Sequence, residues 1–220
     1  MNPKIITGLI SVSLGAVACL GQGTFQNLDF EAAKLVFLVP GEPFIATSNA
    51  LPGWTATYGS SELTAVPYGP AGIMGLVGKS DFGGAIDGNF SASISGGAIS
   101  QTGLVPADAR SLQFKVRSSG AAPNEGVEVW LGGESLPLVG LAAPRGYFLV
   151  GADISSFAGQ TETLSFSGGS LALDDIAFSP QIVPEPGGAA LFLLGVGMLT
   201  SVRRRGCSPP RRASGAAAAC

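Results

Sequence analysis

The sequence contains no histidine among its 220 residues. Histidine is the commonest general base near neutral pH and the commonest metal ligand. Its absence excludes a Ser-His-Asp triad, a Cys-His dyad and any zinc or haem site with a histidine ligand. We therefore expect a protein that is not an enzyme. The remaining enzymatic alternative is a pair of carboxylates acting as acid and base on a glycoside, for which the candidates are Asp81, Asp87, Glu125 and Glu128.

Charged residues are also scarce, at 12% of the chain, against about 25% in ordinary globular proteins. Residues 24–182 carry six basic and 14 acidic residues, a formal net charge of −8. Nucleic-acid phosphates are bound by clustered Lys and Arg, and anionic lipid headgroups need a similar basic patch. This stretch has no such cluster, so we expect no nucleic acid among its partners.

Only three cysteines are present, Cys19, Cys207 and Cys220, and all lie near the ends of the chain. A central domain made of residues 24–182 would therefore contain no disulfide bond. At roughly 160 residues it is long enough to bury an adequate hydrophobic core without one.

Residues 1–23 read as a secretory signal peptide. Lys4 supplies a positive charge, and the uncharged apolar run Ile5–Leu20 follows it. Ala16-Val17-Ala18 offers the small residues that signal peptidase needs. Cys19 leaves a lipoprotein signal as one alternative, and an uncleaved transmembrane anchor is another. The signal-peptide interpretation predicts that the rest of the chain is exported.

The C-terminal end combines three features in order. Val183-Pro184-Glu185-Pro186 is followed by the apolar run Gly187–Val202 and then by Arg203-Arg204-Arg205. The run has 16 residues, whereas a relaxed bilayer span needs about 20, so we expect a short transmembrane helix that inserts transiently. The arginines would stay in the cytoplasm and leave the preceding domain outside.

This arrangement resembles the PEP-CTERM sorting signal, which consists of Pro-Glu-Pro, a hydrophobic helix and a basic cluster. The resemblance implies that an exosortase, a membrane-embedded enzyme similar to cysteine proteases, recognises Pro184, Glu185 and Pro186 and cuts near them. Gly187–Val202 would be the transient anchor and Arg203–Arg205 the basic stop. The family usually ends soon after the basic cluster, whereas here a low-complexity tail of residues 206–220 follows, which we expect to be disordered. A plain tail anchor is the alternative.

Between the two ends, residues 24–182 alternate apolar and polar side chains at the period of a β-strand. The alternation is clearest in Ser111–Ser118 and Gly126–Leu131, and apolar positions recur at Leu28, Phe30, Leu164, Phe166, Leu171, Leu173, Ile176 and Phe178. We expect an all-β domain, an antiparallel β-sandwich or jelly roll, flanked by the N-terminal signal helix and the C-terminal transmembrane helix. Leu28 and Phe30 would mark the first strand, and the only helical turn would lie near Ile154–Ala158.

Segments within this domain also resemble PEP-CTERM proteins of the verrucomicrobial and planctomycetal type. The similar segments are Phe25–Glu31, Leu51–Trp54, Gly151–Thr161 and Leu173–Phe178. Together with the two ends, they extend the resemblance over nearly the whole chain. It implies an exported protein of the cell envelope, the cell surface or an extracellular matrix rich in exopolysaccharide.

A second resemblance is to carbohydrate-binding jelly rolls of the galactose-binding-like type. It depends on the start Asn27-x-x-Phe30-Glu31 and on Asp174-Asp175-Ile176 near the end. In such domains the Glu and one Asp hold a structural calcium ion, which takes about six to eight oxygen ligands. The resemblance implies calcium ligation by Glu31 and Asp175, with Asp174 or Asp29 as a further ligand. The alternative is that these are solvated carboxylates at strand ends, and no other cofactor is expected.

Trp130 is the best candidate for a ligand platform. The strand alternation places it on the outward face with Glu128, whereas Val129 and Leu131 point inward, and an indole face can stack on a sugar ring. Trp54 is expected in the core. Two function classes remain: a structural surface or matrix protein, and a non-catalytic carbohydrate-binding module, which needs Trp130 to be exposed.

Overall fold

The computed structural model describes residues 23–69, 72–79, 83–118, 120, 122–123 and 125–183. The predicted signal peptide up to residue 22, the Pro184-Glu185-Pro186 motif, the run Gly187–Val202, the basic cluster Arg203–Arg205 and the tail lie outside these residues. Within the described part, no helix is long and apolar enough to span a membrane.

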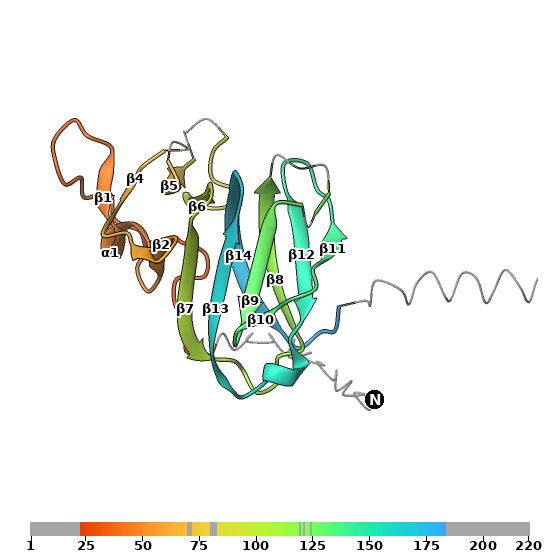
Figure 1. The fold of residues 1–220 in the computed structure, drawn as a ribbon. Helices are drawn as coiled ribbons and strands as arrows, with labels where there is room; N and C mark the ends of the chain where they lie inside the picture. Colours follow the sequence, from red (N-terminus) through yellow and green to blue (C-terminus); the bar gives the residue numbers. More distant parts are fainter. Residues whose placement is uncertain are drawn as a thin grey trace, which may run out of the picture.

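Two six-stranded antiparallel sheets face each other in the described part of the chain (Figure 1). The first sheet has the strand order β10-β9-β13-β7-β2-β3 and the second has the order β11-β12-β8-β14-β6-β5. The strands of the first sheet are β2 (Thr55–Tyr58), β3 (Ser61–Glu62), β7 (Ala98–Leu104), β9 (Val127–Leu131), β10 (Glu134–Ser135) and β13 (Thr161–Gly168). Those of the second sheet are β5 (Met74–Gly78), β6 (Phe90–Ile94), β8 (Ser111–Ser118), β11 (Val139–Ala142), β12 (Phe148–Asp153) and β14 (Leu171–Ser179).

A small third sheet lies beside this pair. It consists of β1 (Phe44–Ala46) and β4 (Ala65–Pro67), which run antiparallel, with Ile45 opposite Val66. Both of these residues are fully buried. The third sheet therefore adds Ile45 and Val66 to the same core, while its end at Phe44 is exposed.

One hydrophobic core joins the two large sheets. On β8, Leu112, Phe114 and Val116 are fully buried, while Gln113, Lys115 and Arg117 are half-buried on the outer face. The Phe114 ring meets the ring of Phe166 on β13 edge-on, with centroids 5.2 Å apart. Trp54, also buried, meets the same Phe166 ring from the end of the first sheet. The predicted all-β antiparallel sandwich is thus confirmed, and so is the burial of Trp54.

The last strand, β14, changes its inward face partway along. Leu171 and Leu173 are buried at odd positions, whereas Ile176 and Phe178 are buried at even ones. The register against β8 shifts between Asp174 and Ala177, and Asp175 has a φ of 48°. An extra residue at a β-bulge moves the following side chains to the opposite face, which keeps both halves of the strand in the core.

The predicted first strand at Leu28 and Phe30 is wrong, although both side chains are buried. Asn27 and Phe30 have φ values of 50° and 58°, and the segment forms turns. The Asn27 side chain stabilises these turns, because its Oδ1 accepts a hydrogen bond of 2.9 Å from the backbone of Ala32. Asn adopts the left-handed backbone conformation more readily than most residues, because its side chain can form hydrogen bonds to the nearby backbone in a turn.

The predicted helical turn is confirmed as a 3₁₀ turn over Ser155–Phe157. Asp153 precedes it and accepts hydrogen bonds from the backbone and hydroxyl of Ser155. The expectation that this was the only helical turn is wrong, because Thr47–Ala50 forms the short helix α1 after β1. A single turn with little amphipathic pattern gives no periodic signal in the sequence.

Candidate functional site

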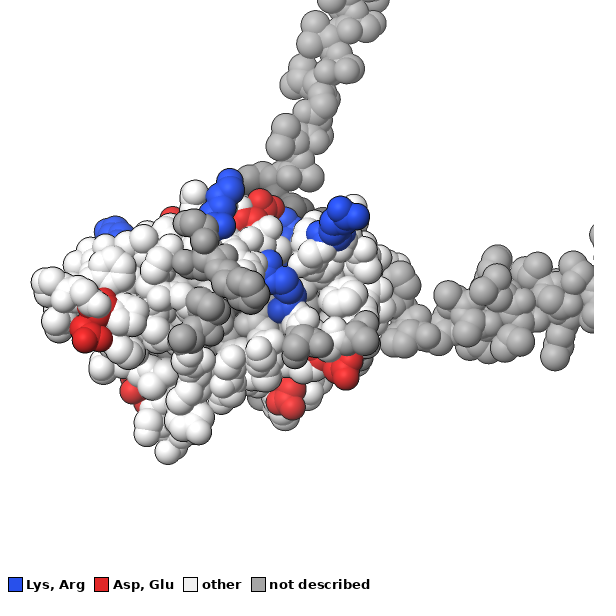
Figure 2. Space-filling model, turned by 90° about the horizontal axis from the view of Figure 1, so that it is seen from above, with Lys and Arg blue, Asp and Glu red and all other residues white. Residues whose placement is uncertain are grey.

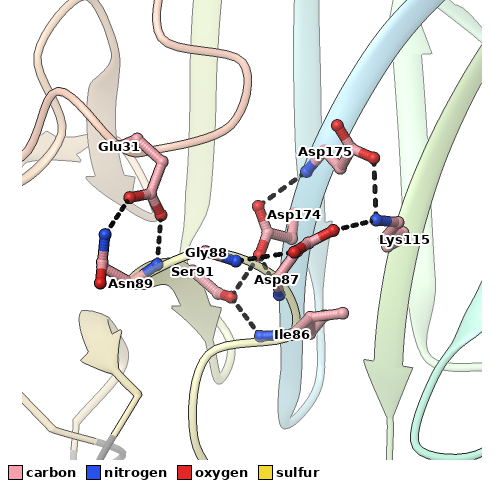
Figure 3. A network of polar contacts seen from close by, with 9 residues as sticks. All are labelled: Glu31, Ile86, Asp87, Gly88, Asn89, Ser91, Lys115, Asp174 and Asp175. Atoms are coloured by element: carbon pink, nitrogen blue, oxygen red, sulfur yellow. Dashed lines mark hydrogen bonds and ion pairs between the residues drawn. The ribbon is translucent and has the colours of Figure 1, made fainter.

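The carboxylates singled out by the sequence gather around the loop that leads into β6, whose described part is residues 83–89 (Figure 3). Asp174 on β14 is almost fully buried, with 1% exposed. Its Oδ2 accepts hydrogen bonds from the Ser91 hydroxyl at 2.7 Å and from the backbone of Asp87 at 3.0 Å. The Ser91 hydroxyl in turn accepts one from the backbone of Ile86 at 2.8 Å. Asp174 thus holds the loop both directly and through Ser91.

Burial raises the pKa of Asp174 to about 6. The hydrogen bonds from Ser91 and from the backbone groups of Asp87 and Asp175 act in the opposite direction, and the nearby charge of Asp175 raises the pKa further. A carboxyl group in this state carries a proton in an appreciable share of molecules just below neutral pH.

Glu31 holds the other end of the same loop. Its Oε1 accepts hydrogen bonds from the backbone of Asn89 at 2.7 Å and of Phe90 at 2.9 Å, and its Oε2 accepts one from the Asn89 side chain at 2.8 Å. Although burial raises the pKa of Glu31, these hydrogen bonds lower it below its ordinary value. A carboxylate that accepts several such bonds is stabilised in its charged form.

Asp175 and Asp87 share Lys115, which projects from β8. The Lys115 Nζ lies 3.0 Å from Asp175 Oδ2 and also donates a short hydrogen bond to Asp87. This hydrogen bond is the main reason why the pKa of Asp87 lies below its ordinary value. Burial lowers the pKa of Lys115, but its two carboxylate partners raise it further than that. The cation between the two carboxylates is therefore supplied by the chain itself.

These residues do not fit a calcium ion in the observed arrangement. The carboxylate oxygens of Glu31 and Asp174 face N–H and O–H donors, and Asp175 faces Lys115. Asp29 accepts a hydrogen bond from the backbone of Glu31. Among the described residues, no three His, Cys, Asp or Glu side chains converge as metal ligands. In this arrangement the carboxylates act as anchors of a loop, and the structure does not test the calcium ligation that the second resemblance implies.

Trp130 lies on the outer surface of the first sheet, with 40% exposed. It is directly opposite Ser135 on β10 and Ser165 on β13. Ser165 is opposite Ser100 on β7, which is opposite Thr55 on β2. Directly opposed residues point to the same side of a sheet, so this row runs across five strands.

Further hydroxyl groups extend this surface, which we call the hydroxyl face. Its members are Trp130 and Glu128 on β9; Thr163, Ser165 and Ser167 on β13; Ser100 and Thr102 on β7; Thr55 and Thr57 on β2; and Ser135 on β10. The hydroxyls of Thr102 and Thr163 are 2.7 Å apart, and that of Ser167 lies 3.4 Å from Glu128 Oε2. The face thus offers one exposed aromatic ring beside rows of hydroxyl groups.

The four carboxylates considered for glycoside hydrolysis are not gathered as an acid and base pair in the described part of the chain. Asp87 is bound to Lys115, Glu125 accepts a hydrogen bond from the backbone of Ala122, and Glu128 lies on the hydroxyl face. Asp81 lies outside the described residues. Sequence reasoning missed Ser91 and Lys115, because nothing in their own segments indicates which distant carboxylates they meet.

Charges of both signs are interspersed on a mostly uncharged surface where Figure 2 looks onto the molecule from above. The described residues of this face form no continuous basic patch. A scan against protein-family models and a search of the curated proteins both found no match.

Proposed function

We propose that the chain is an exported, non-catalytic protein of the cell surface or extracellular matrix, sorted by an exosortase through its C-terminal signal. The observation that carries this proposal is the order of Pro184-Glu185-Pro186, the apolar run Gly187–Val202 and Arg203–Arg205. Sorting of this kind requires the three features together. The motif has to be extended so that an enzyme can reach it, the apolar run has to enter the membrane, and the arginines have to stop the transfer.

The position of the folded domain supports this proposal. Its buried hydrophobic residues begin at Phe25 and end at Val183, and the last strand ends at Ser179. The core thus occupies the stretch between the two proposed export segments. The motif begins directly after Val183, so the proposed cutting site follows the folded domain in the sequence.

The proposal is tested by expressing the chain in a bacterium that has an exosortase. The variant Glu185→Ala alters the motif, and Glu62→Ala replaces an exposed acid on β3 as a matched control. We expect the wild type and Glu62→Ala to leave the membrane fraction and Glu185→Ala to accumulate there. Equal release of all three would contradict recognition of the motif.

A second candidate function is polysaccharide binding by a jelly-roll domain of the galactose-binding-like type. It is favoured by the exposed indole of Trp130 among the hydroxyl groups of the hydroxyl face. An aromatic ring can pack against the apolar side of a sugar, while neighbouring hydroxyls and Glu128 exchange hydrogen bonds with its polar groups. Binding across an open sheet face suits an extended polymer better than a small molecule, because the face offers a row of side chains over five strands.

Retention of the exported chain on immobilised bacterial and algal polysaccharides tests this candidate. Trp130→Ala removes the indole, and Tyr58→Ala removes an exposed aromatic ring at the end of β2 as a control. Binding predicts selective, saturable retention that Trp130→Ala abolishes and Tyr58→Ala preserves. A folded chain that no polysaccharide retains would leave the structural surface protein as the sole candidate.

A further inference from the structure

The guanidinium of Arg117 on β8 is half-buried, and no carboxylate of the described residues pairs with it. Its Nη2 donates a short hydrogen bond to Gly84 O, which is the one hydrogen bond of this side chain within the described part of the chain. Lys115, two residues earlier on the same face, is instead paired with two carboxylates. Burial lowers the pKa of Arg117, and the charge of the nearby Asp174 acts in the opposite direction. A guanidinium has five N–H donors, so most of its donors lack an acceptor.

The register of the second sheet creates a hollow beside Arg117. Arg117 is directly opposite Ala172 on β14, which is opposite Ser93 on β6. Ser93 is in turn opposite Gly75 on β5. Directly opposed residues point to the same side of a sheet, so the side chains of this row shorten from an arginine to a glycine. They leave a hollow of about 260 Å³ above Ala172, lined by Arg117 and Ser93 among others.

The loop that Asp174 and Ser91 hold in place (Figure 3) borders this hollow. Gly83 and Gly84, at the start of its described part, both line the hollow. A Cβ on Gly83 would lie 3.8 Å from Arg117 Nη2, so the guanidinium lies directly beside the loop backbone. The loop therefore positions Arg117 at the rim of the hollow, where its other donors can meet a ligand.

A second hollow, of about 390 Å³, also has Arg117 in its lining. It includes Tyr147 and Phe148 at the start of β12, which pairs with β8 on the side away from β14. Arg117 and Ser118 line both hollows. The guanidinium thus lies between a hollow rich in small polar residues and one that contains aromatic rings.

Hydroxyl groups beside Arg117 also lack partners. The Ser118 Oγ is buried without a hydrogen-bond partner in the described part of the chain. A buried hydroxyl in this state is unfavourable, and a ligand oxygen or hydroxyl that pairs with it removes the cost. Ser93, Ser95 and Ser170 add further hydroxyl groups to the first hollow. The two hollows therefore offer one cation and several hydroxyls to a polar ligand.

We propose that Arg117 binds the carboxylate of an acidic saccharide whose sugar rings lie in the two hollows. A planar guanidinium can hold a carboxylate through two parallel hydrogen bonds. The serine hydroxyls can exchange hydrogen bonds with sugar hydroxyls, and the Tyr147 ring offers a surface for the apolar side of a sugar. Each hollow is close in size to the smaller known ligand sites, which begin at about 300 Å³. The site lies on the second sheet, away from the hydroxyl face of the first, and is independent of both proposed functions.

Fluorescence anisotropy of a labelled oligogalacturonate, titrated with the full chain in a neutral detergent, tests the proposal. Arg117→Gln removes the guanidinium, and Arg110→Gln removes an exposed arginine beyond the other end of β8 as the matched control. Both variants keep the arginines near the C-terminus, so any attraction of the polyanion to them is the same. We expect saturable binding whose Kd rises about tenfold or more in Arg117→Gln and stays unchanged in Arg110→Gln. Equal Kd values for the two variants would overturn the role of Arg117.

Two further variants keep the test independent of the hydrogen bond from Arg117 to Gly84. Ala172→Leu fills the first hollow from its floor and leaves the guanidinium in place, so it should also raise the Kd about tenfold. Ser118→Ala should raise the Kd by about threefold without lowering the free energy of unfolding, because its hydroxyl has no partner to lose. Unchanged binding by Ala172→Leu would show that the hollow is not the site.

Competition against the labelled oligomer identifies the ligand chemistry. Free glucuronate should displace it, whereas glucose at the same concentration should not, because glucose lacks the carboxylate. Sodium sulfate at matched ionic strength should displace it less well than glucuronate does. Equal displacement by sulfate would overturn the saccharide and leave a simple anion site. Equal displacement by glucose, or no saturable binding by the folded wild type, would overturn binding through a carboxylate.

Discussion

The Ser91 hydroxyl on β6 donates a 2.7 Å hydrogen bond to the buried Asp174 carboxylate on β14, 83 residues away in the sequence. The same hydroxyl accepts a hydrogen bond from the backbone of Ile86. One small side chain thus connects a strand, a loop and a nearly buried charge. The Asp87 backbone N–H donates a further hydrogen bond to the Asp174 carboxylate. Together with the two hydrogen bonds of Ser91, it fixes the loop against the second sheet (Figure 3).

Replacement of Ser91 by Ala should lower the free energy of unfolding by about 1–3 kcal/mol, because a buried charged acceptor and a backbone donor each lose a partner. Ser93→Ala, on the same strand but half-buried, should change it by less than about 0.5 kcal/mol. Urea unfolding followed by circular dichroism measures both. Equal effects of the two substitutions would contradict the role given to Ser91.

The contribution of Asp174 to the free energy of unfolding should decrease as the pH rises. Its pKa in the folded state is about 6, raised by burial from an ordinary value of 3.8. Between these values the folded state binds more protons than the unfolded state, so this contribution is fully present below about pH 4 and is lost as the pH rises through about 6. Glu31 and Asp87, whose pKa values are lowered, act in the opposite sense, so their contributions are lost as the pH falls.

A comparison with Asp174→Asn separates the effect of Asp174 from these others, because the amide keeps the shape of the protonated acid. The wild type should lose up to about 3 kcal/mol relative to this variant between pH 4 and pH 7. Denaturant unfolding at several pH values gives the difference. A difference that is constant with pH would show that Asp174 keeps its ordinary pKa.

Calcium should leave the unfolding temperature of the protein unchanged. Lys115 supplies the positive charge between Asp87 and Asp175, and the carboxylates of Glu31 and Asp174 are already occupied by donors. Thermal unfolding in millimolar calcium and in a chelator provides the measurement. A rise with calcium that Asp175→Asn abolishes would instead support the ligand set suggested by the sequence.

The sandwich could be predicted where the alternation is long. The eight residues of β8 and the five of β9 carry enough inward apolar positions to fix both strand and face. Leu28 and Phe30 supply only two such positions, too few to fix a strand. A turn forms there instead, because Asn27 gains hydrogen bonds to distant residues. Its side chain donates to Pro52 O, and its backbone oxygen accepts a hydrogen bond from the Trp54 side chain.

No bulge was predicted in β14, although its apolar positions pass from odd numbers at Leu171 and Leu173 to even numbers at Ile176 and Phe178, which is the pattern a bulge produces. The partners of the acidic residues were not visible. Both Ser91 and Ser93 look alike in an alternating strand, and only the pairing of β6 with β14 decides which of them meets Asp174. Local patterns indicate a strand and its faces, whereas long-range register creates the polar network.

The mass of the intact mature protein, isolated from the cell surface or the medium, checks both proposed processing steps at once. We expect a chain that begins between residues 19 and 24 and ends near Pro184–Pro186, so that both the apolar run Gly187–Val202 and the arginines are missing. A chain that retains its residues to Cys220, or that is found only inside the cell, would contradict export and sorting through this signal.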